Sequence, residues 1–221
     1  LTVGTWIFSW IKPASHVNEI STIDIYEFDV IVVGAGIIGL ATAAEASRHY
    51  EKVLLVEKER SFGNHTSSRN SEVIHSGIYY KPGSLKAKLC VEGRDLLYKY
   101  CEDNSVEHRR CEKLIVARRG QEAELYKLYA NGVVNGLSGL TLLSAAEIKE
   151  REPDIKSSII RAIRVPSTGI VDSHQLMASL EKDAADLGAV IVYDTEVDDV
   201  EYLEGIFTLH FSGEDYTASA P

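Results

Sequence analysis

Between residues 28 and 57 of the 221-residue chain, a strand, a glycine-rich turn, a helix and a second strand are predicted in succession, and this order limits the fold more than any other stretch. Apart from Asp29, residues 28–33 are apolar and rich in β-branched side chains, which predicts a strand buried on both faces of a parallel sheet. Residues 37–50 are predicted to form a helix, and residues 52–57 a second buried strand. The succession indicates a βαβ unit and therefore an α/β fold.

The turn before the helix has the spacing G-x-G-x-x-G at Gly34, Gly36 and Gly39. In such a turn the first glycine permits a tight bend, the second lets the backbone approach a diphosphate, and the third lets the helix lie close to the strand. The helix begins at Ile37 and Ile38, where free N–H groups and the positive end of the helix dipole attract an anion. The motif therefore predicts a diphosphate site.

The second predicted strand ends in an acidic residue, Glu57. Its distance from Gly34 is close to the spacing of about 20 residues at which a carboxylate accepts hydrogen bonds from an adenosine ribose. A 2′-phosphorylated nicotinamide nucleotide would be repelled by that charge. FAD and NAD both remain open at this point, as does a βαβ unit whose glycines serve packing alone.

Composition limits the partners and the compartment. The formal net charge is −10 and no run of Lys or Arg occurs, so we expect no nucleic-acid partner. The three cysteines form no C-x-x-C pair, which favours reduced thiols and an intracellular protein, soluble or peripheral, in the cytoplasm or in the mitochondrion if the source is eukaryotic. No spacing of His, Cys and acidic residues indicates a metal site.

Residues 1–27 precede this fold and are interpreted as an N-terminal tail. Their apolar stretch, residues 6–11, is far too short to span a membrane. The chain does not begin with methionine, so whether it is a natural product or a fragment stays open.

A long polar loop, residues 58–81, follows the second strand where a plain NAD domain would have another crossover. It is dense in hydroxyl, amide and imidazole groups, yet it also carries apolar and aromatic residues that a spacer would not need. Loops longer than about 15 residues in a compact domain are usually functional or disordered. We therefore expect this loop to line a site.

Four segments of the chain carry a resemblance to a known family. They are residues 70–80 (NSEVIHSGIYY), 83–87 (GSLKA), 113–117 (KLIVA) and 166–172 (PSTGIVD). With the glycine motif and Glu57, they resemble the FAD-dependent oxidoreductases of the D-amino-acid-oxidase-type superfamily, most closely the L-2-hydroxyglutarate dehydrogenase/oxidase group. The resemblance extends over residues 28–216 and implies FAD as the cofactor.

The resemblance also implies roles for single residues. In that family, positions matching the loop lie against the diphosphate and the flavin, and the segment around His75 approaches the flavin ring. The cofactor-binding residues implied together by motif and resemblance are Gly34, Gly36, Ile37, Ile38, Gly39, Glu57, Lys58, Thr66, Ser67, Ser68, Asn70, Ser71 and Val197. For Val197, whose segment would meet the adenine end of FAD, an ordinary core position is the alternative.

His75 is the best single catalytic candidate. An imidazole has an ordinary pKa near neutrality and can accept a proton at working pH. The alternative is a histidine that orients the loop or contacts the flavin without proton transfer.

The remaining periodicity completes the expected organisation. Helices are predicted at 84–104 (with apolar positions Leu85, Leu89, Leu96 and Tyr100), 121–135 and after Asp172. Strands are predicted at 113–117, 141–143, 159–165 and 190–193, and residues 206–211 and 216–218 are predicted to form a small antiparallel meander. Ser144 and Glu147 form a predicted capping box. The fold is thus a Rossmann-like FAD-binding domain with an inserted α+β substrate domain: 28–82 and an incomplete 166–221 for the former, 83–165 for the latter.

The expected function is oxidation of a 2-hydroxy acid, in the first place L-2-hydroxyglutarate, to the 2-oxo acid by hydride transfer to flavin. The alternatives are an FAD-dependent amine or amino-acid oxidase on the same fold, and a truncated, non-catalytic nucleotide-binding fragment. The resemblance implies a further strand and turn after Pro221, so the chain alone is expected to bind FAD poorly. The sequence leaves open the electron acceptor, the covalent state of FAD and the oligomeric state.

Overall fold

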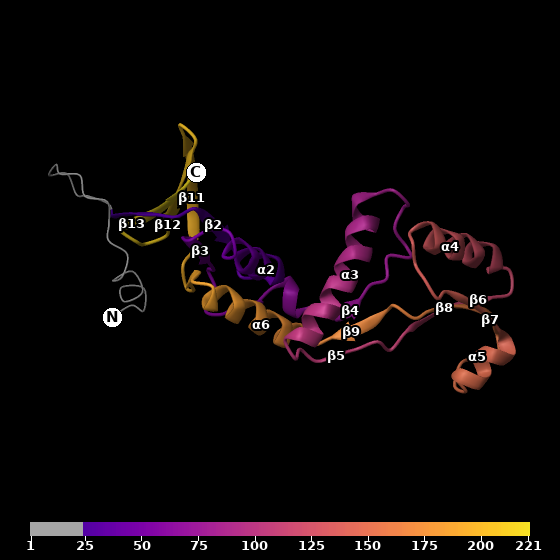
Figure 1. The fold of residues 1–221 in the computed structure, drawn as a ribbon. Helices are drawn as coiled ribbons and strands as arrows, with labels where there is room; N and C mark the ends of the chain where they lie inside the picture. Colours follow the sequence, from indigo (N-terminus) through magenta and orange to yellow (C-terminus); the bar gives the residue numbers. More distant parts are fainter. Residues whose placement is uncertain (1–23) are drawn as a thin grey trace. The chain divides into compact units, whose positions relative to one another are not determined.

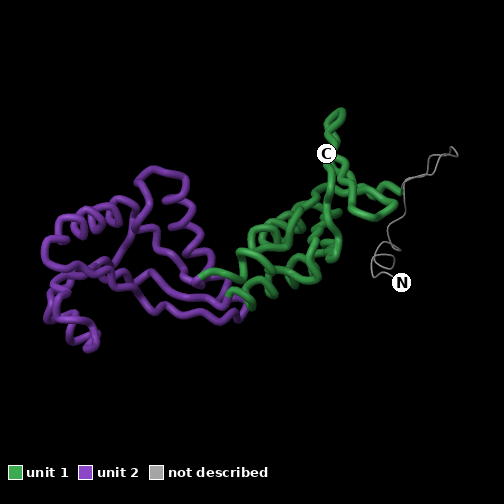
Figure 2. The backbone as a smooth tube through the Cα atoms, turned by 180° about the vertical axis from the view of Figure 1, so that it is seen from behind, with its two compact units in different colours: residues 1–70, 173–221 green, residues 71–172 purple. Residues whose placement is uncertain are grey.

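The computed structural model describes residues 24–221 and divides them into two compact units. The first unit contains the described residues up to Asn70 together with Ser173–Pro221, and the second is Ser71–Asp172 (Figure 2). The second unit is therefore an insertion within the first. The predicted tail lies mostly outside the described residues, but its last four form strand β1 (Asp24–Glu27), so the prediction of a tail up to residue 27 was wrong.

A parallel sheet of three strands forms the centre of the first unit. Its order is β10 (Val190–Val192), β3 (Val53–Val56) and β2 (Val30–Val33), and Val32 pairs with Leu55. The predicted parallel strand near residue 190 is thus confirmed. Helices α2 (Ile37–Ala46) and α6 (Ser173–Asp186) lie side by side along this unit (Figure 1). They cover one side of the sheet in a core that contains Leu40, Ala43, Leu55, Met177 and Ala184.

A second sheet in the same unit has the order β1, β13 (Tyr216–Ala220), β12 (Ile206–Phe211) and β11 (Val197–Leu203). Strands β12 and β13 pair antiparallel, which confirms the predicted meander. Strand β11 extends it by pairing antiparallel with β12, whereas β1 joins β13 in parallel. A second core cluster joins the two sheets, with Phe28, Leu54 and Val56 packed against Leu209 and Phe211. The βαβ unit is therefore covered on both sides.

Two local predictions in this unit need correction. Strand β3 is fully buried, but β2 is not: it is an edge strand of the described sheet, and Val33 at its end is 59% exposed. Helix α2 stops at Ala46 rather than at residue 50. The Ser47 hydroxyl donates to the carbonyl of Ala43 (2.8 Å), and the next bonds are short-range turns, so the helix tightens and ends there.

The second unit contains two antiparallel three-stranded sheets. One has the order β6 (Lys113–Arg118), β8 (Ile159–Val165) and β7 (Thr141–Ser144), and the other β4 (Val73–Ile74), β9 (Gly169–Val171) and β5 (His108–Arg109). Helix α4 (Glu122–Val134) packs over β6 and β8. Their shared core contains Ile78, Leu125, Leu137, Ile163 and Val165.

The other two helices of this unit show one confirmed prediction and one error. Helix α5 (Ala145–Arg151) starts with the predicted capping box between Ser144 and Glu147. Helix α3 (Leu85–Asp103) has the predicted extent but turns another face inward: Ala87, Tyr98 and Cys101 are buried, while Leu85, Leu89 and Leu96 are exposed. The Tyr98 hydroxyl donates to the carbonyl of Ser167 (3.3 Å), so the tyrosine and not the leucine stripe fixes the helix orientation.

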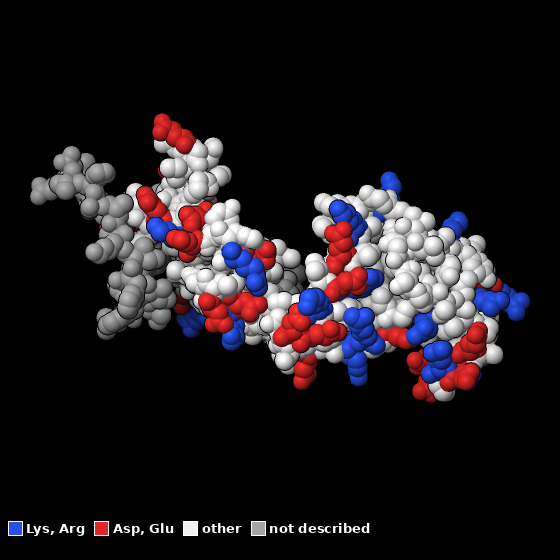
Figure 3. Space-filling model, in the orientation of Figure 1, with Lys and Arg blue, Asp and Glu red and all other residues white. Residues whose placement is uncertain are grey.

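Charged side chains of both signs are interspersed on the face drawn in Figure 3. Many form pairs one helical turn apart, such as Lys88 with Glu92, Lys99 with Asp103 and Lys182 with Asp186. Such exposed pairs contribute little to stability, typically about 0–1 kcal/mol each. Among the described residues, no helix combines the length and apolar character needed to cross a bilayer.

Candidate functional site

The glycine turn of the first unit has the geometry that its spacing predicted. Gly34 lies at φ +98°, a left-handed conformation that favours glycine, and its N–H donates to the carbonyl of Val56 (2.7 Å). A Cβ atom on Gly39 would lie 1.9 Å from the Gly34 carbonyl oxygen. Helix α2 can therefore approach the end of β2 only because position 39 has no side chain.

The polar loop folds back over the first turn of α2. Ser67, in the short helix η2 (Thr66–Ser68), accepts a hydrogen bond through Oγ from the N–H of Ile37 (3.0 Å). A Cβ on Gly36 would lie 3.2 Å from this oxygen, so the second glycine makes room for the loop. The N–H of Gly63 donates to the carbonyl of Ala35 (3.0 Å). The loop thus contacts the glycine turn at two points.

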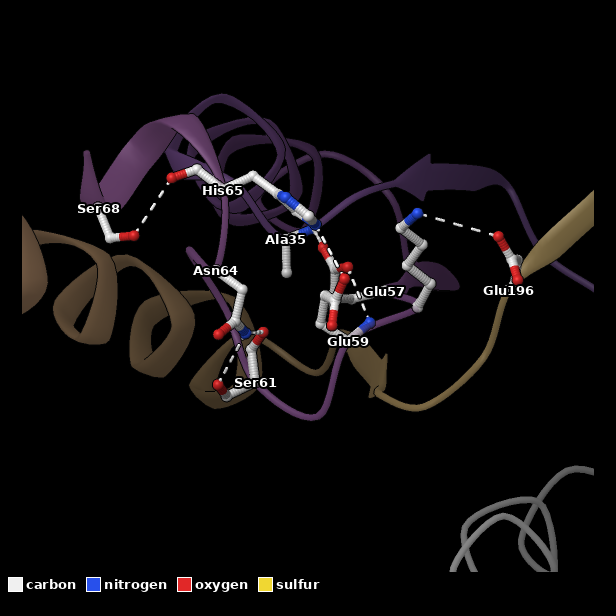
Figure 4. A network of polar contacts seen from close by, with 9 residues as sticks. Ala35, Glu57, Glu59, Ser61, Asn64, His65, Ser68 and Glu196 are labelled. Atoms are coloured by element: carbon white, nitrogen blue, oxygen red, sulfur yellow. Dashed lines mark hydrogen bonds and ion pairs between the residues drawn. The ribbon is translucent and has the colours of Figure 1, made fainter. Parts of the chain in front are cut away.

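Glu57 connects the second strand to the same turn. Its Oε2 accepts from the N–H of Ala35 (2.7 Å) and its Oε1 from the N–H of Glu59 (3.0 Å), as Figure 4 shows. The residue is only 9% exposed. A carboxylate has about four lone-pair positions, so each oxygen can accept one further hydrogen bond. Two adjacent ribose hydroxyls are suitable donors for these positions.

Short-range hydrogen bonds give the loop its shape. Glu59 Oε1 lies 2.9 Å from His65 Nε2, and Ser68 Oγ donates to the carbonyl of His65 (3.2 Å). Asn64 Nδ2 donates to the carbonyl of Ser61 (2.7 Å). Figure 4 shows these contacts beside Glu57 and Ala35. The loop is therefore held by its own polar groups close to the glycine turn.

The other predicted cofactor residues occupy varied environments. Asn70 Nδ2 donates to the carbonyl of Ser67 (2.7 Å), and Lys58 Nζ lies 3.9 Å from Glu196 Oε1. Val197, at the start of β11, packs against the second core cluster, as its core alternative predicted. Ile38, Thr66 and Ser71 are exposed, and Ser71 is the first residue of the second unit. For these six residues, cofactor contact stays a prediction.

His75 lies in the second unit, directly after β4. The side chain is exposed, while its carbonyl accepts a weak hydrogen bond from the Cys90 thiol (3.5 Å). Partial burial of the ring lowers the pKa of His75 below its ordinary value, and the nearby charges of Lys113 and Lys86 lower that pKa further. The imidazole is thus biased towards its neutral, proton-accepting form.

Sequence reasoning missed four residues around the segment after His75. The lysines Lys86 and Lys113 lie over the rings of Tyr80 and Tyr79, at 4.7 and 5.7 Å from Nζ to the ring centroids. Asn131 on α4 and Asn135, which caps the C-terminus of that helix, donate hydrogen bonds to the backbone carbonyls of this segment. Amides spaced four residues apart on a helix usually face solvent, so nothing in the sequence pattern distinguished them.

A βαβ unit with a glycine turn, a helix N-terminus and a buried carboxylate at the second strand defines a dinucleotide-binding α/β protein. The sequence profile described as "FAD dependent oxidoreductase" matches residues 29–219. The chain therefore belongs to the FAD-dependent oxidoreductase family. The positive end of α2 and the acceptor oxygens of Glu57 have the chemistry that suits the adenosine diphosphate part of that family's cofactor.

Curated relatives are more than 40% identical to this chain over the residues that align. It is 43% identical over 192 residues to mitochondrial L-2-hydroxyglutarate dehydrogenase of Pongo abelii, covering 86% of this chain and 45% of the relative. The human protein of the same name is 44% identical over 177 residues, covering 79% and 38%. The chain thus spans less than half the length of these relatives.

Solved structures give the same fold. An FAD-bound L-α-glycerophosphate oxidase of Mycoplasma pneumoniae superposes with a TM-score of 0.80 at 28% identity, covering 87% of this chain and 52% of the oxidase. A glycine oxidase of Geobacillus kaustophilus superposes with a TM-score of 0.77 at 26% identity, covering 88% and 53%. The fold of the described residues is therefore that of this group of flavoenzymes.

Proposed function

We propose that the protein containing this chain oxidises a 2-hydroxy acid, most specifically L-2-hydroxyglutarate, to the corresponding 2-oxo acid with FAD as the hydride acceptor. The observation that carries the proposal is the glycine turn joined to Glu57, in a chain 43–45% identical to proteins named L-2-hydroxyglutarate dehydrogenase. The turn supports the cofactor, and the relatives support the substrate.

In this proposal the first unit holds the adenosine end of FAD. Glu57 accepts hydrogen bonds from the ribose hydroxyls. The first turn of α2 faces the diphosphate through its N–H groups other than that of Ile37, which donates to Ser67. Lys58, Thr66, Ser67, Ser68, Asn70, Ser71 and the backbone of Val197 contribute further contacts. Bound FAD would supply the two-electron acceptor that no side chain provides.

His75 is proposed as the proton acceptor for the substrate hydroxyl. Removing that proton as the hydride leaves the adjacent carbon prevents a positive charge from building up on the substrate. The lowered pKa of His75 supports this role because it keeps the imidazole neutral. The alternative is that His75 only positions the loop or the flavin. Replacement of His75 should slow flavin reduction strongly if it accepts the proton.

Oxidation of an amine or amino acid is the second candidate, because glycine oxidase shares the fold at 26% identity. A fold alone does not select a substrate. The higher identity to the L-2-hydroxyglutarate dehydrogenases favours the hydroxy acid. The name of these relatives also supports a mitochondrial location in a eukaryotic source.

The visible spectrum of the FAD-loaded protein tests the proposal. Under anaerobic conditions, L-2-hydroxyglutarate is expected to bleach the flavin band, while the D enantiomer, glycine and L-proline leave it unchanged. Bleaching by amino acids alone would replace the first candidate with the second. Absence of flavin after reconstitution would instead leave a non-catalytic nucleotide-binding fragment.

A further inference from the structure

Two amide side chains, one on α4 and one at its C-cap, hold the short segment Gly77–Tyr80 that follows His75. Asn131 Nδ2 donates to the carbonyls of Ile78 (2.6 Å) and Tyr80 (2.8 Å), and Asn135 Nδ2 donates to those of Gly77 (3.0 Å) and Tyr80 (2.9 Å). Each amide nitrogen thereby uses both of its N–H groups. The segment is not part of any strand that the structure describes and has no ladder of hydrogen bonds to a neighbouring strand. The two asparagine side chains satisfy backbone carbonyls of the segment instead.

Close packing fixes the same segment from two helices. On α4, a Cβ at Gly132 would lie 3.0 Å from Ile78 Cγ1, and Ile78 is only 1% exposed. On the other side, a Cβ at Gly77, which lies at φ +92°, would be 3.0 Å from Val91 Cγ2 on α3. Figure 1 shows α3 and α4 in this part of the second unit. The tyrosines of the segment are therefore presented from a rigid backbone.

Each of these tyrosines carries a lysine ammonium near its ring. Lys86 from α3 lies over Tyr80, and Lys113 from the start of β6 lies over Tyr79, which is 54% exposed. In the part of the chain that the structure describes, neither lysine lies within 4.0 Å of a carboxylate, in contrast to Lys88 on the same helix. Ring faces attract cations without neutralising them. The two charges therefore remain available to an anion.

We propose that Lys86 and Lys113 bind the distal carboxylate of a dicarboxylic 2-hydroxy acid, and that Asn131 and Asn135 are the positioning residues that hold this site. The identity of the anion rests on the proposed function, whereas the site is a property of the second unit. A carboxylate next to the reacting carbon needs fixed, bidentate geometry, which arginine provides. A distal carboxylate needs mainly charge, and flexible lysines supply that.

Single substitutions in the FAD-loaded protein test the lysines. Lys86→Gln and Lys113→Gln are expected to raise KM for L-2-hydroxyglutarate roughly tenfold each, as expected for loss of one charge contact, with little change in the limiting rate of flavin reduction. With L-2-hydroxypentanoate, which lacks the distal carboxylate, kcat/KM should not change. Lys88→Gln, two residues from Lys86 and paired with Glu92, is the matched control. Equal losses with both substrates would overturn the site.

The positioning role has its own readout. Asn135→Ala and Asn131→Ala should raise KM selectively for the dicarboxylic substrate while the FAD absorbance is retained. Asn104→Ala removes another amide-to-carbonyl bond, from Nδ2 to the carbonyl of Tyr100 (3.0 Å), and should leave that selectivity unchanged. If these variants have a lowered melting temperature but an unchanged KM for the dicarboxylic substrate, both asparagines have a structural role only.

Glutarate binding tests the site without turnover. Nuclear magnetic resonance of the His75 ring should show a saturable shift on addition of glutarate, no such shift with pentanoate, and a lost response in the Lys86→Gln, Lys113→Gln double variant. Glutarate binding without flavin reduction by any 2-hydroxy acid would refute the proposed function and keep the site. Reduction by L-2-hydroxyglutarate with wild-type behaviour of both lysine variants would refute the site and keep the function.

Discussion

The two units present their functional groups in opposite ways. In the first unit, the candidate cofactor site is made mostly of backbone: glycines at fixed spacing, a helix N-terminus and one carboxylate that accepts backbone N–H bonds. In the second unit, side chains from α3, α4 and β6 assemble around the segment Gly77–Tyr80. Backbone recognition suits a cofactor of constant shape, whereas side chains adapt more easily to different substrates. The following predictions test this difference, beginning with the largest expected effect.

Gly39→Ala should damage the first unit most. The added Cβ would lie 1.9 Å from a backbone oxygen, which no side-chain rotation relieves, so we expect a loss of about 3 kcal/mol or more of unfolding free energy and little FAD retention. Denaturant titration and flavin absorbance measure both. The control is Gly93→Ala on α3, where nothing lies within 4 Å and a gain of about 0.5–1 kcal/mol is expected. Equal behaviour of the two variants would contradict the packing role of Gly39.

His75→Ala tests the chemistry assigned to the second unit. It should slow flavin reduction by about 10²- to 10⁴-fold while FAD stays bound, as stopped-flow absorbance would show. A variant that reduces its flavin at the wild-type rate would leave His75 only a positioning role.

The pH profile sharpens that test. Because the pKa of His75 is lowered, the wild-type rate should hold as pH falls through the ordinary value of about 6.5 and decline only near the lower, folded-state pKa. Lys113→Gln removes one cause of the lowering, so its decline should begin at higher pH. The unfolded chain takes up this proton first, so acidification from about pH 6.5 down to the folded-state pKa should also reduce stability. An unchanged profile in Lys113→Gln would contradict the electrostatic coupling.

Glu57→Gln should weaken FAD retention about ten- to hundredfold with the fold largely intact. The neutral amide keeps one acceptor oxygen, but its NH₂ group faces an N–H donor from either Ala35 or Glu59. Equilibrium dialysis of FAD measures the change. Glu59→Gln, which removes a neighbouring charge beside His65, serves as the control and should change affinity much less. Unaltered affinity in Glu57→Gln would refute the ribose contact.

Ser144→Ala has the smallest expected effect, because it alters only the capping box of α5 in the second unit. Loss of the cap to the Glu147 N–H should cost about 1 kcal/mol and raise hydrogen exchange within Ala145–Arg151. Flavin binding should stay at the wild-type level. Weaker FAD binding in this variant would contradict the proposal that the first unit holds the adenosine end of FAD without a contribution from α5.

The parts of the fold that were predictable from sequence depend on neighbours in the chain. The glycine turn, the buried strand β3 and the Ser144–Glu147 box each involve residues a few positions apart, so spacing was enough. The inward face of α3 was mispredicted because three exposed leucines follow the helical period while Tyr98 decides the orientation through a distant contact with Ser167.

In the candidate site too, local spacing predicted some residues, while residues joined by distant contacts were missed. Glu57 was identified from its spacing to the glycines, and its bond to Ala35 is now visible. Asn131 and Asn135 reach carbonyls more than 50 positions earlier in the chain, and no local period marks such a pair. Lys86 and Lys113 were missed because their proximity to Tyr80 and Tyr79 depends on the folded segment.

The parallel pairing of β1 with β13 has a consequence for the order of folding. Asp24 pairs with Tyr216, and the sheet next to it needs β10, so both sheets of the first unit contain strands made after the whole of Ser71–Asp172. The second unit, by contrast, is a continuous stretch of chain whose strand pairs all lie within it. During synthesis it can fold while β1 still lacks its partner β13. The segment that begins the described fold is thus the one that waits longest to be completed.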